Sequence, residues 1–169
     1  MKDRESKVII PSKLKTLLKR LRRQNKKIVF TNGCFDIIHA GHVRYLKGAK
    51  RLGDMLIVGL NSDSSVRKIK GDFRPLIHQK ERAEVLSALE PVNYVVIFNE
   101  TTPLKLIKNI SPDVLVKGAD WRGHEIVGSD YVKAAGGRIA RIRLVKGRST
   151  SSIIKKILYT YGSCKTSVE

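Results

Sequence analysis

Residues 28–42 read IVFTNGCFDIIHAGH and contain the start of a pattern that continues through the chain. Residues 28–30 are continuously apolar, which predicts a strand buried on both faces. Gly33 permits a tight turn with exposed backbone N–H groups, and a helix is expected to begin near Gly41. The N-terminus of that helix would face the same space as the turn, so a phosphate group is the natural occupant of this loop.

Outward from this loop, strand and helix alternate. Further apolar runs predict strands at residues 55–60, 94–98, 114–116 and 139–142. Helical spacing separates these runs and predicts helices at residues 42–52, 79–89, 103–109, 129–135 and 149–161. This alternation is typical of an α/β fold with a doubly wound, parallel, five-stranded sheet. In such sheets ligands bind beyond the carboxyl ends of the strands, so we expect the chemistry in those loops.

The residues before the first strand have a different character. Leucines at positions 14, 17, 18 and 21 form one apolar stripe among Lys and Arg, which predicts a basic amphipathic helix. Such a helix either packs on its own domain or lies on RNA or a membrane surface, and packing is the commoner outcome. The chain is therefore divided into a basic helical extension at residues 1–27, an α/β domain at residues 28–162 and a tail at residues 163–169.

Composition limits the classes of partner. The formal net charge of +19 calls for an anionic partner, yet the positive charge is spread along the chain and only 6% of residues are aromatic. Few aromatic side chains are available to stack on bases, so we expect no stable nucleic-acid partner. Apolar runs fall short of the roughly 20 residues needed to span a bilayer, and the N-terminus lacks the features of a secretory signal. We expect a cytoplasmic protein without a membrane span.

Two cysteines, Cys34 and Cys164, lie far apart without a CxxC pattern, which indicates neither a disulfide framework nor a zinc site. His39 and His42 are three residues apart and flank the expected helix start, where both could contact an α-phosphate. A partial metal site and a pair of unrelated surface histidines are the alternatives. No neighbouring ligand set completes a metal site, so we expect no protein-held metal.

The segment GCFDIIHAGH resembles the G-x-F-D-x-x-H-x-G-H signature of the cytidylyltransferase-like nucleotidyltransferases, which have a Rossmann-like sheet. The hydroxyl-rich turn at residues 147–153 resembles their second signature. VGLNSDSSVRKIKGDFRPL, ALEPVNYVV and PDVLVKGADW are similar to the D-glycero-β-D-manno-heptose 1-phosphate adenylyltransferases, and the match runs from about residue 28 to residue 157. That module is often fused behind a ribokinase-like heptose kinase, and this chain is expected to be the stand-alone form.

The resemblance implies roles for individual residues. We expect the loop after the second strand to carry Asp63 and Lys70, although a merely solvated basic loop is the alternative. Lys47 either contacts phosphate or points to solvent, and Trp121 either covers the sugar or packs under a loop. His78 and His124 are expected to be ordinary surface histidines. The implied catalytic residues are His39, His42, Lys70 and Arg82; nucleotide contacts are expected from Thr31, Asn32, Gly33, Cys34, Phe35, Gly41, Lys117, Gly118, Asp120, Ser149 and Thr150; and acceptor contacts are expected from Asp36, Asp63 and Arg74.

The activity that the resemblance implies is transfer of AMP from ATP to a heptose 1-phosphate, with Mg²⁺ held mainly by the triphosphate. A homodimer is expected on the same grounds. A cytidylyltransferase acting on glycerol 3-phosphate or a related alcohol phosphate is the first alternative. The second is a basic module that binds nucleic acid or membranes and has no activity.

Overall fold

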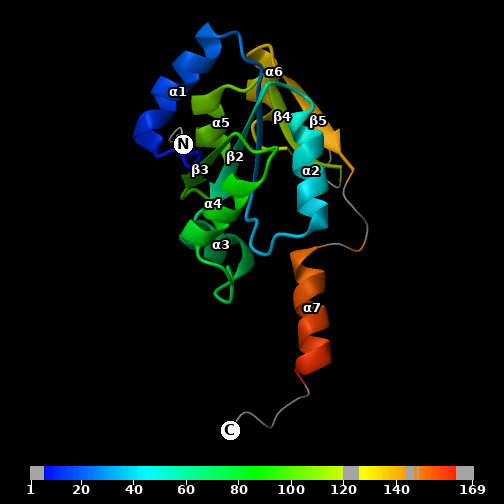
Figure 1. The fold of residues 1–169 in the computed structure, drawn as a ribbon. Helices are drawn as coiled ribbons and strands as arrows, with labels where there is room; N and C mark the ends of the chain where they lie inside the picture. Colours follow the sequence, from blue (N-terminus) through cyan, green and yellow to red (C-terminus); the bar gives the residue numbers. More distant parts are fainter. Residues whose placement is uncertain (1–5, 120–125, 144–146, 148, 163–169) are drawn as a thin grey trace, which may run out of the picture.

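The computed structural model describes residues 6–119, 126–143, 147 and 149–162; the expected tail at residues 163–169 and the residues Asp120, Trp121 and His124 lie outside this part. Five parallel strands form one sheet in the order β3-β2-β1-β4-β5, which confirms the predicted doubly wound α/β fold (Figure 1). The strands are β1 (Ile28–Gly33), β2 (Met55–Asn61), β3 (Tyr94–Phe98), β4 (Val114–Gly118) and β5 (Arg138–Ile142).

The central strand β1 is the point from which the sheet extends in both directions. It pairs with β2 from Ile28↔Met55 to Gly33↔Leu60, and with β4 at Val29↔Val114. The connections that leave β1 and β4 therefore diverge at the carboxyl edge of the sheet. A crevice at such a switch point is where an α/β sheet binds ligands.

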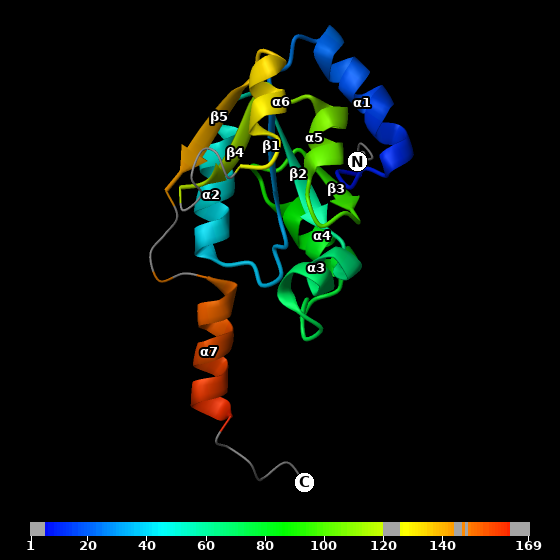
Figure 2. The same cartoon turned by 180° about the vertical axis from the view of Figure 1, so that it is seen from behind.

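Helices cover both faces of the sheet (Figures 1 and 2). Alternate side chains of β1 point to opposite faces: Ile28 and Phe30 belong to one buried cluster and Val29 to the other. The first cluster also receives side chains from α1 (Pro11–Arg23), α5 (Leu104–Ile110) and α6 (Ser129–Ala134), and the second from α2 (Ala40–Lys50) and α4 (Gln79–Ala88).

Helix α1 packs on its own domain, as its leucine stripe predicts. Leu14, Leu17, Leu18 and Leu21 are all buried in the first cluster. The segment before α1 also follows the edge strand, because the backbone of Val95 accepts a hydrogen bond from Ile9 and donates one to Lys7. Residues 6–27 are therefore an integral part of the core, and the basic side chains of α1 remain on the outside.

One helix differs from expectation. The segment expected to be a loop after β2 begins with helix α3 (Asp63–Lys70), which Ser62 caps by accepting a hydrogen bond from Ser65 N–H. At the other end of the chain, α7 (Thr150–Tyr161) extends beyond the sheet and buries none of its residues (Figures 1 and 2). Within the described residues, no helix combines the length and apolar character needed to cross a membrane.

Candidate active site

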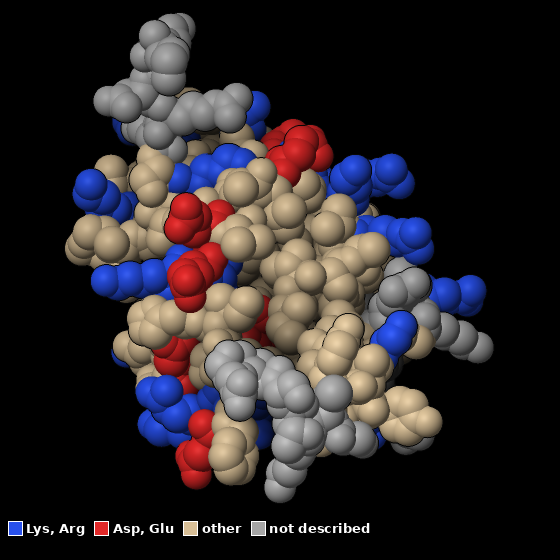
Figure 3. Space-filling view, turned by 60° about the horizontal axis from the view of Figure 1, so that its bottom comes forward, with Lys and Arg blue, Asp and Glu red and all other residues tan. Residues whose placement is uncertain are grey.

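A cavity of about 560 Å³ lies at the carboxyl edge of the sheet, large enough for a nucleotide-sized ligand. Figure 3 looks towards this end of the molecule, where Lys and Arg side chains surround a hollowed face of mostly uncharged residues. The wall combines segments from the whole chain. The expected site residues that line it are Asn32, Gly33, Cys34, Phe35, Asp36, His39, Gly41, His42, Lys70, Arg74, Lys117, Gly118, Ser149 and Thr150.

The loop after β1 is held in an unusual backbone conformation. Phe35 adopts a positive φ of 45°, and its ring lies so close to Gly33 that a Cβ there would come within 3.0 Å of the ring. A side chain at position 33 would therefore crowd the Phe35 ring and force it to shift by a few tenths of an ångström. Residues 32–36 of this turn all line the cavity.

Asp36 ties this loop to the segment before α4. Its buried carboxylate accepts hydrogen bonds from Leu76 N–H at 2.9 Å and Ile77 N–H at 3.0 Å, and it forms an ion pair with the Arg74 guanidinium. Burial by itself would raise the pKa of Asp36, but these hydrogen bonds and the Arg74 charge together lower it. Asp36 therefore remains ionised and orders the wall, although it was expected to contact the acceptor.

His39 and His42 form a stacked pair at the start of α2. Their ring centroids are 3.9 Å apart, and His39 caps the helix because its Nδ1 accepts a hydrogen bond from Gly41 N–H. The Nδ1 atom of His42 is buried and makes no hydrogen bond to any described residue. Burial, and then the neighbouring His39, lower the pKa of His42 to about 4. His42 is therefore neutral at neutral pH and acts as a hydrogen-bonding group rather than a cation.

Positive charge reaches the cavity from two sides. Lys70 ends α3 and Arg74 follows it, so both cations lie on the side of the loop that Asp36 anchors. Opposite, at the end of β4, Lys117 Nζ donates a hydrogen bond of 2.5 Å to Asn32 Oδ1 on β1. Burial lowers the pKa of Lys117 to about 8. An anion in the cavity would favour the charged form of this amine.

The hydroxyl-rich turn closes the remaining side. Ser149 caps α7 in a reciprocal arrangement with Ser152, and Thr150 Oγ1 donates a hydrogen bond of 3.3 Å to the carbonyl of Ile37. The first turn of α7 is therefore joined directly to the loop that carries the histidines. The N–H groups of a helix start attract anions, so this turn adds a second phosphate-binding element.

Three expected site residues lie elsewhere. Thr31 is fully buried, with its hydroxyl paired to the Tyr45 hydroxyl at 2.8 Å. Asp63 and Arg82 form a buried ion pair behind the wall, so in this structure Arg82 contacts backbone carbonyls and a carboxylate and is not placed to reach phosphate. The exposed Lys47 does not line the cavity. Asp120 lies outside the described residues.

Several wall residues were not expected from the sequence. Residues 101–103 follow β3, and the rule that ligands bind beyond strand ends could have indicated them. Ile126 and Val127 carry no polar motif and gave no signal. The other unexpected wall residues are Tyr45, Asn61, Ile69 and Ser151.

The wall offers two imidazoles, of which His42 is neutral, together with two helix starts and three cations, an arrangement suited to a polyphosphate ligand. Within the part of the chain that the structure describes, no three His, Cys, Asp or Glu side chains are grouped to hold a metal ion.

Comparison with known proteins agrees with this geometry. The chain is 52% identical over 157 residues to a bifunctional protein HldE of Syntrophotalea carbinolica, covering 93% of this chain and 32% of that protein. Another HldE, of Wolinella succinogenes, is 54% identical over 155 residues, covering 92% and 32%. The chain thus spans about a third of the length of these relatives.

A solved structure, that of the lipopolysaccharide core biosynthesis protein from Thermoplasma volcanium, superimposes with a TM-score of 0.59 at 30% identity, covering 72% of this chain and 98% of that one. A family model described as cytidylyltransferase-like matches residues 30–156. These matches show that the chain belongs to the cytidylyltransferase-like family.

Proposed function

We propose that this chain transfers AMP from ATP to D-glycero-β-D-manno-heptose 1-phosphate, forming ADP-heptose and pyrophosphate for the lipopolysaccharide core. The observation that carries the proposal is the meeting of the twin-histidine turn and the Ser149–Thr150 turn in one cavity. The high identity to HldE proteins and the likeness to the Thermoplasma lipopolysaccharide core biosynthesis protein support the sugar and its destination. The bifunctional relatives are about three times as long as this chain, which is consistent with a module that also occurs fused to a second enzyme domain.

The reaction needs no covalent enzyme intermediate. An oxygen of the sugar phosphate attacks the α-phosphorus of ATP in line, the new P–O bond forms, and pyrophosphate leaves with the electrons of the broken bond. Because the phosphate nucleophile is already anionic near neutral pH, no general base has to remove a proton. The barrier is then mainly one of positioning two mutually repelling anions.

The residues of the cavity can supply this positioning. Neutral His42 and its partner His39 would donate hydrogen bonds to the α-phosphate oxygens as charge develops in the transition state. Lys70, Arg74 and Lys117 would offset the repulsion between the two substrates. Since the described residues offer no cluster of metal ligands, we propose that Mg²⁺ enters bound to the triphosphate, where it neutralises charge on the phosphates.

One experiment tests substrate and nucleotide together. The protein is incubated with Mg²⁺, either ATP or CTP, and a panel of phosphorylated sugars and glycerol 3-phosphate, and the products are identified by mass. ADP-heptose as the dominant product supports the proposal. CDP-glycerol would instead identify the cytidylyltransferase alternative, and no product with RNA binding in a salt-dependent gel shift would favour the inactive basic module.

We also propose that the active form is a cytoplasmic homodimer that binds no nucleic acid stably. Helix α7 supports the dimer, because Leu158 is 63% exposed and Tyr159 is 88% exposed although both are large and apolar. Side chains of this kind are usually covered when they cluster on a surface. Light scattering of wild type and Leu158→Glu would show a dimer and a monomer, respectively; a monomeric wild type would contradict the proposal.

A further inference from the structure

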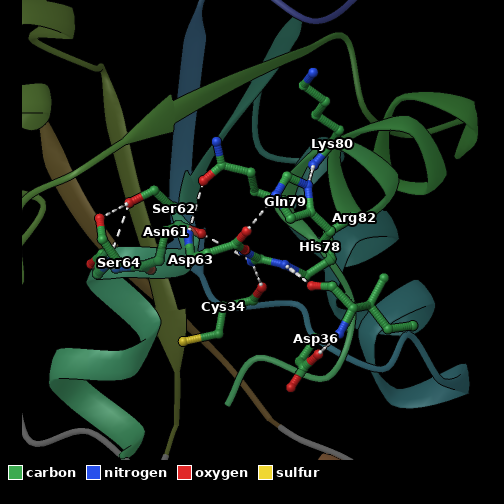
Figure 4. Close-up of polar contacts among 12 residues, drawn as sticks. Cys34, Asp36, Asn61, Ser62, Asp63, Ser64, His78, Gln79, Lys80 and Arg82 are labelled. Atoms are coloured by element: carbon green, nitrogen blue, oxygen red, sulfur yellow. Dashed lines mark hydrogen bonds and ion pairs between the residues drawn. The ribbon is translucent and has the colours of Figure 1, made fainter. Parts of the chain in front are cut away.

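Arg82 is a buried cation that the proposed reaction does not use directly. Its side chain is 0% exposed, and it lies on α4 behind the cavity wall (Figure 4). A buried charge is costly unless every donor is matched to an acceptor. The question is what this guanidinium achieves at that position.

The guanidinium joins three segments of the chain: the loop after β1, the connection from β2 to α3, and the segment before α4. Figure 4 shows Cys34, Asn61 and Asp63 around the Arg82 side chain. The three segments contribute four acceptors in total. They are the Ile77 carbonyl (2.9 Å from Nε), the Cys34 carbonyl (2.5 Å from one terminal nitrogen), the Asn61 carbonyl (2.9 Å from the same nitrogen) and the Asp63 carboxylate (2.7 Å from the other).

These same segments carry the cavity wall. Cys34 and Asn61 line the cavity themselves. Asp63 begins α3, the helix that ends at Lys70, and Ile77 belongs to the segment that carries Arg74. The Arg82 side chain therefore connects the loop after β1 (residues 32–36, called the nucleotide loop from here on) to the segments that carry the cations Lys70 and Arg74.

We propose that Arg82 is a positioning residue that sets the distance between the nucleotide loop and the cations Lys70 and Arg74, and so aligns ATP with the acceptor phosphate. The inference rests on the proposed adenylyl transfer. It differs from a direct phosphate contact, because Arg82 would act only through the segments it holds.

The shape of the guanidinium explains why arginine is needed. It presents five N–H donors in a rigid plane, whereas lysine presents three on one small group. A lysine at position 82 would retain the charge but could not reach all four acceptors at once. The Arg82→Lys variant therefore separates the effect of the positive charge from the effect of the hydrogen bonds that hold the segments together.

Steady-state kinetics of Arg82→Lys supply the first test. Misplacement of a reacting group by about 1 Å costs about 100-fold in rate, so we expect kcat to fall by about 100-fold while KM for ATP changes by only a few fold. A residue that only bound ATP, equally strongly in the ground state and the transition state, would give the opposite split, with kcat retained and KM raised. The matched control is Lys80→Gln, which removes an exposed positive charge from the same helix and should leave kcat unchanged.

Labelling of Cys34 supplies a second readout that does not depend on turnover. Burial raises the pKa of the Cys34 thiol, so iodoacetamide should react with it slowly in a Cys164→Ser background. Releasing the Cys34 carbonyl should expose the loop and speed labelling at least several fold in Arg82→Lys. Because lysine keeps the positive charge, a faster reaction reports movement of the loop.

The outcomes are distinguishable. Unchanged kcat and unchanged Cys34 labelling in a folded Arg82→Lys protein would overturn the positioning role. Asp63→Asn keeps an acceptor but removes its charge, so it should lower kcat and speed Cys34 labelling by smaller factors than Arg82→Lys does. This variant replaces Arg82→Lys in the test if Arg82→Lys is too unstable to assay. A wild-type protein that makes no nucleotide sugar would remove the proposed function, whereas the labelling comparison would still decide whether Arg82 holds the loop.

Discussion

The His42 ring contacts the rings of Phe35 and His39, with centroid distances of 5.2 and 3.9 Å. The sequence motif indicated that this histidine contacts phosphate, but it left open whether the ring is charged. Burial answers that question, because desolvation disfavours the imidazolium ion. A neutral ring can donate a hydrogen bond to a developing charge without attracting the ground-state anion equally strongly, which is the requirement for accelerating the chemical step.

We expect His39→Ala and His42→Ala each to lower kcat by about 100-fold or more, the usual scale for losing a transition-state donor. Thermal unfolding should show that both variants are folded. The matched control is Arg44→Ala, which changes an exposed residue on the same helix, α2, that does not line the cavity. Near-normal turnover in both cavity variants would contradict the assigned role.

The lowered pKa of His42 also makes a prediction about stability. In the unfolded chain this histidine takes up a proton near pH 6.5, whereas in the folded protein it does so only near pH 4. The unfolded state therefore binds more protons within this window, and the free energy of unfolding should fall as the pH is lowered from 6.5 to 4. Replacing His42 with Gln should make that dependence shallower. Urea unfolding across this pH range would measure it, and identical slopes for both proteins would refute the buried neutral state.

At the scale of elements, the strands were easier to predict than the helices. Continuous apolar runs located all five strands, and β3 agrees residue for residue. Helix α3 was missed because DSSVRKIK carries only two apolar residues, and Val66 is the one it buries. Its start depends on the Ser62 cap, a local signal that the apolar pattern does not reveal. Arg82 was expected in the catalytic site but lies behind its wall for a similar reason: a sequence motif identifies a residue but does not show which way its side chain points.

Helix α1 provides a test of packing at this scale. Leu21 is 1% exposed, and removing such a side chain typically costs about 2–5 kcal/mol of unfolding free energy. We expect a loss in this range for Leu21→Ala and less than about 0.5 kcal/mol for the exposed neighbour Lys19→Ala. Equal, small effects in urea unfolding would mean that α1 is a detached extension.

The start of α7 separates capping from ligand binding. Ser149 and Ser152 share one capping arrangement, but only Ser149 lines the cavity. Ser149→Ala and Ser152→Ala should therefore weaken the helix start similarly, while only Ser149→Ala raises KM for ATP substantially, by about 10-fold for a lost phosphate hydrogen bond worth about 1.5 kcal/mol. If the two variants have the same KM, Ser149 acts only as a cap.

At the scale of the whole molecule, the sheet order explains how distant motifs meet. Parallel strands place every loop after a strand at one edge, so segments separated by more than a hundred residues reach the same cavity. The sequence identified both turns, whereas their contact through Thr150 and Ile37 required the fold. The net charge of +19 creates a field that attracts anionic ligands, although a few cations at the cavity would suffice for the proposed chemistry.

The most direct test is a crystal structure of the protein with Mg²⁺ and a non-hydrolysable ATP analogue. We predict that the triphosphate lies between the His39–His42 pair and the Ser149–Thr150 turn, with the α-phosphate against the histidines. An analogue bound at any other place, with these two turns empty of phosphate, would contradict the account.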